Sequence, residues 1–319
     1  MSAFDAYIRL EGTVQGTVSL DESMARHTTY RIGGPAALYV ECDSVADLAL
    51  TLDVLSEEGL EWTVVGRGSN LLVADEGYDG AVVVLGGEFS RSGLNGLERH
   101  DASCPDPSDD GEVVVAAGAG NILSRLVQQA FGCGLSGLEF AVGVPGTLGG
   151  ALYMNAGSGD TWIGGIVDTV TSYKPGEGLK IRHGYEVDWG YRRSGLPRDE
   201  VIVECTLRLH RGDKAAIGAQ MEASLKRRKA RQPLDAASCG SVFKNPQGNS
   251  AGRLISRCGL KGTSCGGAKI SEKHANFIVN TGCATAVDVL TLIHLARDRV
   301  EETHGIRLRP EVRFLGFAQ

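Results

Sequence analysis

Three short motifs carry side chains that could act together on a carboxylate substrate. They are Gly-Tyr-Arg-Arg-Ser at residues 190–194, Gly-Ser-Val-Phe-Lys-Asn-Pro at 240–246 and Pro-Glu-Val-Arg-Phe at 310–314. An arginine and a glutamate at one site, here Arg192 and Glu311, can hold a carboxylate and stabilise its enolate form. A serine in a Gly-Ser turn, here Ser241, can present its hydroxyl to a reacting carbon. Each also has a simpler interpretation, namely a surface arginine, a turn serine and a solvent-facing strand glutamate.

Two glycine-rich loops could bind phosphate. They are Gly-Arg-Gly-Ser-Asn at residues 66–70 and Gly-Val-Pro-Gly-Thr-Leu-Gly-Gly at 143–150. Their backbone N–H groups are not obstructed by side chains, and such groups bind phosphate oxygens well. Either loop alone could be a tight turn. The two together, with Asn-Ala-Gly close behind at 155–157, favour a binding role.

Neither of two common nucleotide-binding motifs is complete in this sequence. Residues 66–71 and 118–123 begin like G-x-G-x-x-G, but they end in Leu71 and Leu123. The Rossmann motif requires the third glycine for helix packing and an acidic residue about 20 positions later. No G-x-x-x-x-G-K-[ST] sequence occurs either. We therefore exclude a Rossmann fold and a P-loop.

Composition excludes further classes. The 319 residues suggest two domains at roughly 150 residues each. The net charge of −7 argues against a general nucleic-acid binder. No apolar run approaches the roughly 18 residues of a membrane span, and the first 12 residues lack the apolar core of a signal peptide. We expect a cytoplasmic protein.

The eight cysteines form no C-x-x-C pair and have no histidine at zinc-finger spacing. We therefore predict no metal site, and scattered thiols in a reducing compartment. Cys239, two positions before Ser241, could be reactive, although a buried thiol is the simpler interpretation.

The elements that must position these residues alternate along the chain in an α+β pattern. The predicted strands span residues 37–41, 62–65, 81–85, 113–117, 275–280 and 306–314. The predicted helices are one that begins after Ser44 and those over 121–131, 214–231, 251–258 and 288–302. The polar stretch 98–111 is expected to be a surface insertion, and a domain boundary is expected near residue 210.

Taken in order, these motifs and Thr-Thr-Tyr-Arg-Ile-Gly-Gly at 28–34 resemble the UDP-N-acetylenolpyruvoylglucosamine reductases, flavoenzymes of peptidoglycan precursor synthesis. The resemblance covers roughly residues 24–316. It implies a vanillyl-alcohol-oxidase-type (PCMH-like) FAD-binding fold over residues 1–210, with subdomains at about 1–86 and 87–210. It also implies a C-terminal α/β substrate domain over residues 211–319. About 15 residues separate Ser194 from Leu209, as in the shorter subtype that lacks a substrate-closing tyrosine loop.

The same resemblance assigns site residues. Ser241 is the proton donor, and Arg192 and Glu311 stabilise charge on the substrate. The residues expected to bind FAD are Gly66, Arg67, Gly68, Ser69, Asn70, Leu71, Gly146, Thr147, Gly149, Gly150, Asn155, Gly157, Ile202 and Arg313. Those expected to bind substrate are Tyr191, Arg228, Arg231, Lys244, Asn245 and His274. The match around His274 belongs to only part of the family, and residues 226–231 could also be a solvated helix face.

The implied reaction has two halves. NADPH reduces FAD, and the reduced flavin then passes hydride to the methylene carbon, C3, of an enolpyruvyl UDP-sugar. Charge on C2 spreads into the carboxylate, where Arg192 and Glu311 hold it, and Glu311 needs a proton to donate a hydrogen bond. Ser241 then protonates C2. The expected partner is the UDP-sugar enolpyruvyl ether, with no nucleic acid or membrane, and the chain is expected to be a monomer.

Two rival functions remain open. A different flavin oxidase or dehydrogenase of the same fold, acting on an alcohol or hydroxy acid, would leave the motifs at 240–246 and 310–312 without a purpose. A non-catalytic nucleotide- or nucleic-acid-binding protein could use residues 226–231. The charge of −7 and the absence of aromatic residues from that segment count against it.

Overall fold

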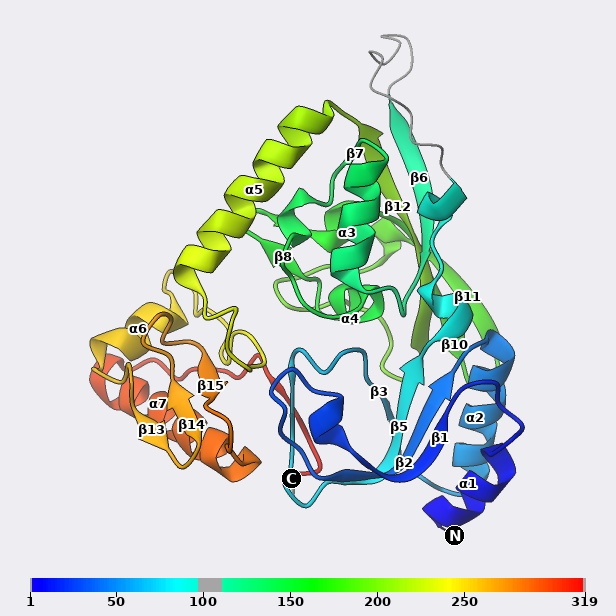
Figure 1. The fold of residues 1–319 in the computed structure, drawn as a ribbon, viewed down its shortest axis with the longest axis horizontal. Coiled ribbons are helices and arrows are strands. Elements are labelled where there is room, and N and C mark those ends of the chain that lie inside the picture. Colours follow the sequence, from blue (N-terminus) through cyan, green and yellow to red (C-terminus); the bar gives the residue numbers. More distant parts are fainter. Residues whose placement is uncertain (1, 97–110, 318–319) are drawn as a thin grey trace. The chain divides into compact units, whose positions relative to one another are not determined.

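The computed structural model describes residues 2–96 and 111–317 (Figure 1). The chain divides into two compact units. Unit 1 contains Met1–Ser19, Tyr39–Gly66 and Val82–Arg227, and unit 2 contains Leu20–Leu38, Arg67–Ala81 and Arg228–Gln319. Helices and strands are mixed in both units, as expected of an α+β chain. Nearly all of the predicted insertion at 98–111 lies outside the described residues.

Unit 1 contains an antiparallel sheet with the strand order β11-β10-β12-β6, and β7 pairs with β12. These strands are β6 (Glu112–Gly118), β7 (Leu135–Ser136), β10 (Val167–Lys174), β11 (Gly178–His183) and β12 (Val201–Arg211). Helix α3 (Leu123–Gly132) buries Leu123, Leu126, Val127 and Ala130, a spacing that places all four on one face. The short helix α4 (Leu148–Tyr153) and the hairpin of β8 (Gly157–Ser158) and β9 (Thr161–Trp162) follow.

The N-terminal residues form helix α1 (Ala3–Leu10). Ser2 caps it by accepting a hydrogen bond from the Asp5 N–H group. Ala6 and Leu10 are completely buried, and α1 contacts α2 (Val45–Glu57). Arg9 also forms an ion pair of 2.8 Å with Glu58, the residue that follows α2. Residues 2–10 are therefore an ordered part of unit 1.

Four further strands form a sheet with the order β1-β2-β5-β3. They are β1 (Val18–Ser23), β2 (Pro35–Cys42), β3 (Trp62–Val64) and β5 (Tyr78–Leu85). The short 3-10 helices are η1 (Met24–Arg26), η2 (Gly87–Ser90), η3 (Gly93–Gly96), η4 (Glu139–Ala141), η5 (Ile163–Gly165) and η6 (Gly184–Glu186). Helix α5 (Lys214–Arg231) has the predicted bounds.

Unit 2 is built around helix α7 (Ala286–His304). Thr285 and Asp288 form a capping box at its start, and Gly305, with φ 65°, ends it in the left-handed conformation that favours glycine. The other elements are β4 (Leu71–Val73), α6 (Ala251–Arg257), β13 (Ser264–Cys265), β14 (Ala268–Ile270), β15 (Ile278–Asn280) and β16 (Arg313–Leu315). The order β13-β14-β15 forms one antiparallel sheet, and β16 pairs in parallel with β4.

The predicted strand over residues 306–314 is wrong for most of its length. Only Arg313–Leu315 forms a strand, and Pro310 makes an isolated bridge to Phe243. Proline has no N–H group to contribute to a strand ladder, so the alternating pattern of this segment does not become a regular strand. The predicted strand 275–280 is confirmed only as Ile278–Asn280. In the part of the chain that the structure describes, no helix has the length and apolar character needed to cross a membrane.

Candidate active site

Ser241 and Glu311 lie on paired segments of unit 2. The backbone N–H of Glu311 donates to the carbonyl of Val242, at 2.7 Å. Phe243 forms a bridge with Pro310, and the N–H of Lys244 donates to the carbonyl of Arg309, at 2.9 Å. The two predicted catalytic residues are thus neighbours across this pairing, although about 70 positions separate them in sequence.

The first glycine loop joins the same arrangement through Asn70. Its Nδ2 donates to the carbonyl of Glu311 at 3.1 Å, and its own carbonyl accepts from the N–H of Arg313 at 2.9 Å. Leu71 then pairs with Arg313 at the start of the parallel β4–β16 pair. Three residues predicted to bind FAD, Asn70, Leu71 and Arg313, are therefore next to the predicted catalytic residue Glu311.

Gly68 is held by Thr29, a residue of the 28–34 motif to which no site role was assigned. The backbone N–H and the Oγ1 of Thr29 both donate to the Gly68 carbonyl, at 3.4 and 3.5 Å. Oγ1 also donates to the carbonyl of Ser238 at 2.7 Å, three residues before Ser241. Thr29 thus connects the glycine loop to the catalytic segment. The sequence did contain a signal for Thr29, because it lies in the 28–34 motif, which is part of the family resemblance.

Gly68 itself must be a glycine. Its φ is 57°, and a Cβ at this position would lie 2.3 Å from the carbonyl oxygen of His27. The N–H groups of Gly66, Arg67 and Gly68 donate to no acceptor among the described residues. Consecutive backbone N–H groups left available by the protein suit an anionic group, so the loop fits the pyrophosphate of FAD.

The second glycine loop, in unit 1, is interlocked with residues 118–123. Thr147 caps α4 by accepting from the Gly150 N–H group, at 3.3 Å. The N–H of Gly149 donates to the backbone carbonyl of Ala119, and the N–H of Leu148 donates to that of Asn121, both at 2.8 Å. Gly66 packs against this loop, because its Cβ would lie 2.4 Å from Thr147 Oγ1.

The glycines of residues 118–120, which imitate a Rossmann motif, serve packing instead. A Cβ on Gly118 would lie 2.2 Å from the carbonyl oxygen of Phe89, and one on Gly120 would lie 2.4 Å from that of Leu85. Both positions therefore require glycine for close backbone approach.

Arg192 lies on a tight turn of unit 1. Gly190 and Arg193 close the turn with two hydrogen bonds, at 2.9 and 3.1 Å. Buried Asn155 anchors the turn, because its Nδ2 donates to the Gly190 carbonyl at 3.0 Å. Arg192 has a φ of 54°, a conformation that costs a non-glycine residue about 1–2 kcal/mol. Backbone strain of this kind is typical of functional sites.

The Arg192 guanidinium is directed toward predicted neighbours. Nη1 and Nη2 each lie 3.5 Å from the carbonyl oxygen of Gly157, and the guanidinium carbon is 5.3 Å from the centre of the half-exposed Tyr191 ring. Unit 1 therefore groups Arg192 with Asn155, Gly157 and Tyr191. Ser241 and Glu311 belong to unit 2. Ile202, also predicted to contact FAD, is buried on β12.

Two predicted substrate-binding arginines occupy the last turn of α5. Arg228 is partly buried and Arg231 is exposed, and the helix ends before Pro233. Lys226, Arg227 and Lys229 are exposed. The basic segment thus combines a solvated face with one partly buried arginine.

Asn245 and His274 are both in unit 2. Asn245 Oδ1 accepts from the N–H of Ala251 at the start of α6, at 3.0 Å. His274 Nδ1 accepts from the backbone N–H of Asn276, at 3.2 Å. Burial lowers the pKa of His274, and the nearby charge of Lys261 lowers it further. The imidazole is therefore neutral and carries its proton on Nε2, where it can donate to a ligand. Lys244, the remaining predicted substrate residue, is half-buried.

Cys239 is a buried thiol, which confirms the simpler of the two interpretations of this residue. It is 2% exposed, and burial is the main cause that raises its pKa to about 12. The charge of Glu311 acts in the same direction. All seven cysteines of the described ranges are free thiols, and those ranges contain no cluster of metal-ligating side chains.

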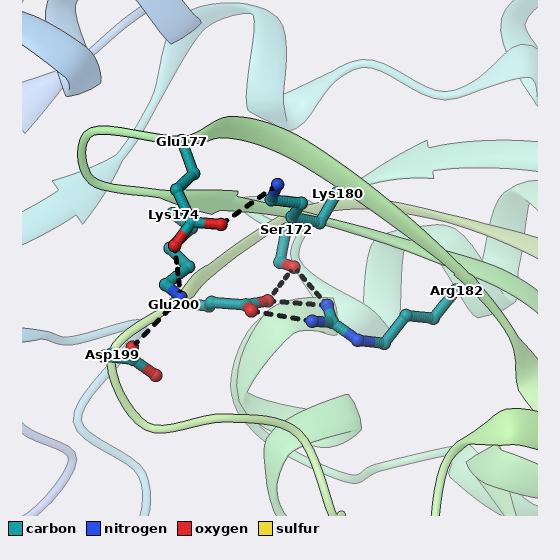
Figure 2. Close-up of polar contacts among 7 residues, drawn as sticks. All are labelled: Ser172, Lys174, Glu177, Lys180, Arg182, Asp199 and Glu200. Atoms are coloured by element: carbon teal, nitrogen blue, oxygen red, sulfur yellow. Dashed lines mark hydrogen bonds and ion pairs between the residues drawn. The ribbon is translucent and has the colours of Figure 1, made fainter.

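A separate ionic network joins β10 and β11 to the turn between them and to the residues just before β12 (Figure 2). Arg182 forms two bonds of 2.6 and 2.7 Å with Glu200, which also accepts from the Ser172 hydroxyl. Burial would raise the pKa of Glu200, but these hydrogen bonds outweigh it and the pKa is lowered. Lys174 and Lys180 flank Glu177 at the edge of the network. No predicted site residue is a member, so we assign it a structural role.

Comparisons with known proteins agree with this arrangement. A family model described as UDP-N-acetylenolpyruvoylglucosamine reductase, C-terminal domain, matches residues 232–315. A second, described as FAD binding domain, matches residues 36–174. The predicted combination of an FAD-binding fold with a separate C-terminal domain is thereby confirmed.

Similar whole proteins were found as well. A UDP-N-acetylenolpyruvoylglucosamine reductase of Heliobacterium modesticaldum is 45% identical over 92% of this chain and 90% of the relative. One of Bacillus subtilis is 41% identical over 94% of this chain and 95% of the relative. The crystal structure of UDP-N-acetylenolpyruvylglucosamine reductase from Thermus caldophilus is 34% identical. It superposes with a TM-score of 0.77 over 94% of this chain and 99% of that one.

Proposed function

This chain belongs to the UDP-N-acetylenolpyruvoylglucosamine reductase family, and on that premise we propose that it reduces the enolpyruvyl UDP-sugar to UDP-N-acetylmuramate in peptidoglycan precursor synthesis. It is a flavin-dependent oxidoreductase with FAD as cofactor and NADPH as co-substrate. When bound, FAD would supply the redox chemistry that links NADPH to the substrate. The protein supplies placement and electrostatics.

The observation that carries this proposal is the pairing of the Ser241 and Glu311 segments beside Asn70. The Glu311 N–H donates a hydrogen bond to the Val242 carbonyl, and Asn70 Nδ2 donates one to the Glu311 carbonyl. A hydroxyl, a carboxyl group and a loop suited to a pyrophosphate thus belong to one hydrogen-bonded arrangement. The rival alcohol or hydroxy-acid oxidase has no use for it.

In the proposed reaction the protein stabilises the negative charge that develops on the substrate and donates one proton to it. Hydride arrives at C3 of the enol ether, and negative charge develops at C2 and spreads into the carboxylate. Arg192 and Glu311 stabilise that charge, with Glu311 protonated so that it can donate a hydrogen bond. Ser241 donates its hydroxyl proton to C2 and completes the lactyl ether.

We propose that FAD is held by the residues that the family resemblance assigns. In unit 2 these are Arg67, Gly68, Ser69, Asn70, Leu71 and Arg313, and in unit 1 they are Gly66, Gly146, Thr147, Gly149, Gly150, Asn155, Gly157 and Ile202. Glycines allow a phosphate to approach the backbone, and residues 155–157 would lie beside the flavin ring. In this proposal residues 1–210 form the FAD-binding region and 211–319 the substrate domain.

The substrate carries two phosphates and a carboxylate, so an enzyme with a net charge of −7 needs a local positive site. We propose that Arg228 and Arg231 bind the phosphates. Tyr191, Lys244, Asn245 and His274 are the further substrate contacts. We propose that the enzyme works in the cytoplasm, and that it does so as a monomer of the shorter subtype.

An anaerobic colour test examines the function directly. The purified protein should be yellow, NADPH should bleach it, and the enolpyruvyl UDP-sugar should restore the colour. A yellow protein that an alcohol bleaches and NADPH does not would support the rival oxidase. A colourless protein that shifts nucleic acid in a gel would support the non-catalytic binder.

A further inference from the structure

Asn276 forms a reciprocal pair of hydrogen bonds with the backbone of Phe243. Its Oδ1 accepts from the Phe243 N–H at 3.0 Å, and its Nδ2 donates to the Phe243 carbonyl at 2.8 Å. Asn276 is 3% exposed and Phe243 is 1% exposed. The carboxamide therefore satisfies both polar groups of a buried residue that is two positions after Ser241.

The main chain of Asn276 makes two more bonds to the same neighbourhood. Its carbonyl accepts from the N–H of Val242 at 2.9 Å, and its N–H donates to His274 Nδ1 at 3.2 Å. Val242 also accepts the N–H of Glu311. The two residues that follow Ser241 are thus fixed on one side by Glu311 and on the other by Asn276.

We propose that Asn276 is a positioning residue of this reductase, which holds the Ser241 hydroxyl in place through Phe243 and fixes the imidazole tautomer of His274 through its N–H. This inference rests on the proposed function for the roles of Ser241 and His274. Asn276 acts through these residues and does not itself need to touch substrate. Because the bond to Nδ1 leaves the proton of a neutral His274 on Nε2, both supported groups are hydrogen-bond donors.

Removing the carboxamide should affect one half-reaction. In Asn276→Ala the Ser241 segment loses two bonds, and a displacement of about 1 Å costs roughly a hundredfold in rate. We expect NADPH to reduce the flavin of the holoenzyme as fast as in the unmodified protein. Reoxidation by the enolpyruvyl UDP-sugar should be slowed by about tenfold to a hundredfold.

Thr285→Ala is the matched control. It removes the N-cap of α7, also in unit 2, where Thr285 Oγ1 accepts from Asp288 at 3.1 Å. A lost cap destabilises the fold by about 1 kcal/mol without changing any bond to Phe243 or His274. Both half-reactions of this variant should keep their rates.

The isosteric variant Asn276→Asp distinguishes the positioning role from a general loss of stability. A protonated carboxyl group can accept from the Phe243 N–H and donate to its carbonyl, as the amide does, whereas an ionised one faces that carbonyl unfavourably. Burial raises the pKa of a carboxyl group, so the competent neutral form is present at low pH. Reoxidation by this variant, measured against the unmodified enzyme at each pH, should recover as the pH falls.

Amide hydrogen exchange supplies a readout that is independent of turnover. In the holoenzyme, the Phe243 N–H should exchange faster in Asn276→Ala than in Thr285→Ala. Reoxidation of Asn276→Ala at the control rate would overturn the proposal. So would equal slowing of both half-reactions with unchanged exchange at Phe243. If Asn276→Ala does not fold, the pH series of Asn276→Asp decides, and a flat profile overturns the proposal. Failure of the unmodified protein to be bleached and recoloured would instead refute the proposed function.

Discussion

The N–H of Glu311 donates a 2.7 Å hydrogen bond to the carbonyl of Val242, the residue that follows Ser241. This bond joins the C-terminal Pro-Glu-Val motif to the Gly-Ser motif within unit 2. A proton donor and a charge-stabilising carboxyl group are consequently positioned by backbone pairing, which holds them more rigidly than contacts between long side chains would.

Ser241→Ala should separate the two half-reactions. Reduction of the flavin by NADPH does not use the hydroxyl and should stay nearly intact. Reoxidation by the enolpyruvyl UDP-sugar should be slowed by about 10²–10⁴-fold, because general acid catalysis is lost. Stopped-flow absorbance of the flavin measures both steps. Ser264→Ala, an exposed change in β13, is the control. Equal slowing of both steps would refute the role given to Ser241.

Arg228→Ala and Arg231→Ala should chiefly raise the apparent KM for the UDP-sugar and leave kcat nearly unchanged. An interaction with phosphate is the same in the ground state and the transition state, so its loss weakens binding alone. Steady-state kinetics measure the effect. Lys229→Ala, on the exposed face of the same helix, is the control and should change neither constant. A large loss of kcat at unchanged KM would contradict phosphate binding.

Gly68→Ala should abolish retention of FAD. Its Cβ would lie 2.3 Å from the His27 carbonyl oxygen, in addition to the strain of a φ of 57°. Gly59 has a similar φ of 63° but nothing within 4 Å of its Cβ, so Gly59→Ala isolates the strain, which is about 1–2 kcal/mol. The flavin-to-protein absorbance ratio and the thermal midpoint measure both effects. Equal flavin content in the two variants would show that this loop is not part of the cofactor site.

Cys239 should resist alkylation in the folded protein at pH 8, whereas the exposed Cys283 should react. Burial raises the pKa of the Cys239 thiol from 9.0 to about 12, so the reactive thiolate is absent. The unfolded thiol ionises first as the pH rises. The contribution of the buried Cys239 thiol to the stability of the folded state is therefore complete below pH 9 and is lost as the pH rises toward 12. Mass mapping of labelled peptides tests this, and labelling of Cys239 at the rate of Cys283 would contradict it.

The sequence by itself determined the elements that depend on local interactions. Helix α5 has the predicted bounds, and α2 begins after Ser44 as expected, because capping and apolar spacing act within a few residues. The order of the motifs also identified the family and the candidate residues. The strand predicted over 306–314 was wrong, since alternation alone does not reveal whether a partner strand is available.

Only the tertiary structure decided which distant residues meet. Asn70 bonds to Glu311 across 241 positions, and Thr29 bonds to Ser238 across 209. The carboxamide of Asn276 supports Phe243 through two hydrogen bonds to its backbone, across 33 positions. Such contacts depend on the path of the whole chain between them. A residue's type and local spacing therefore indicate what it could do, and the long-range pairing of buried polar groups selects the residues that hold it in place.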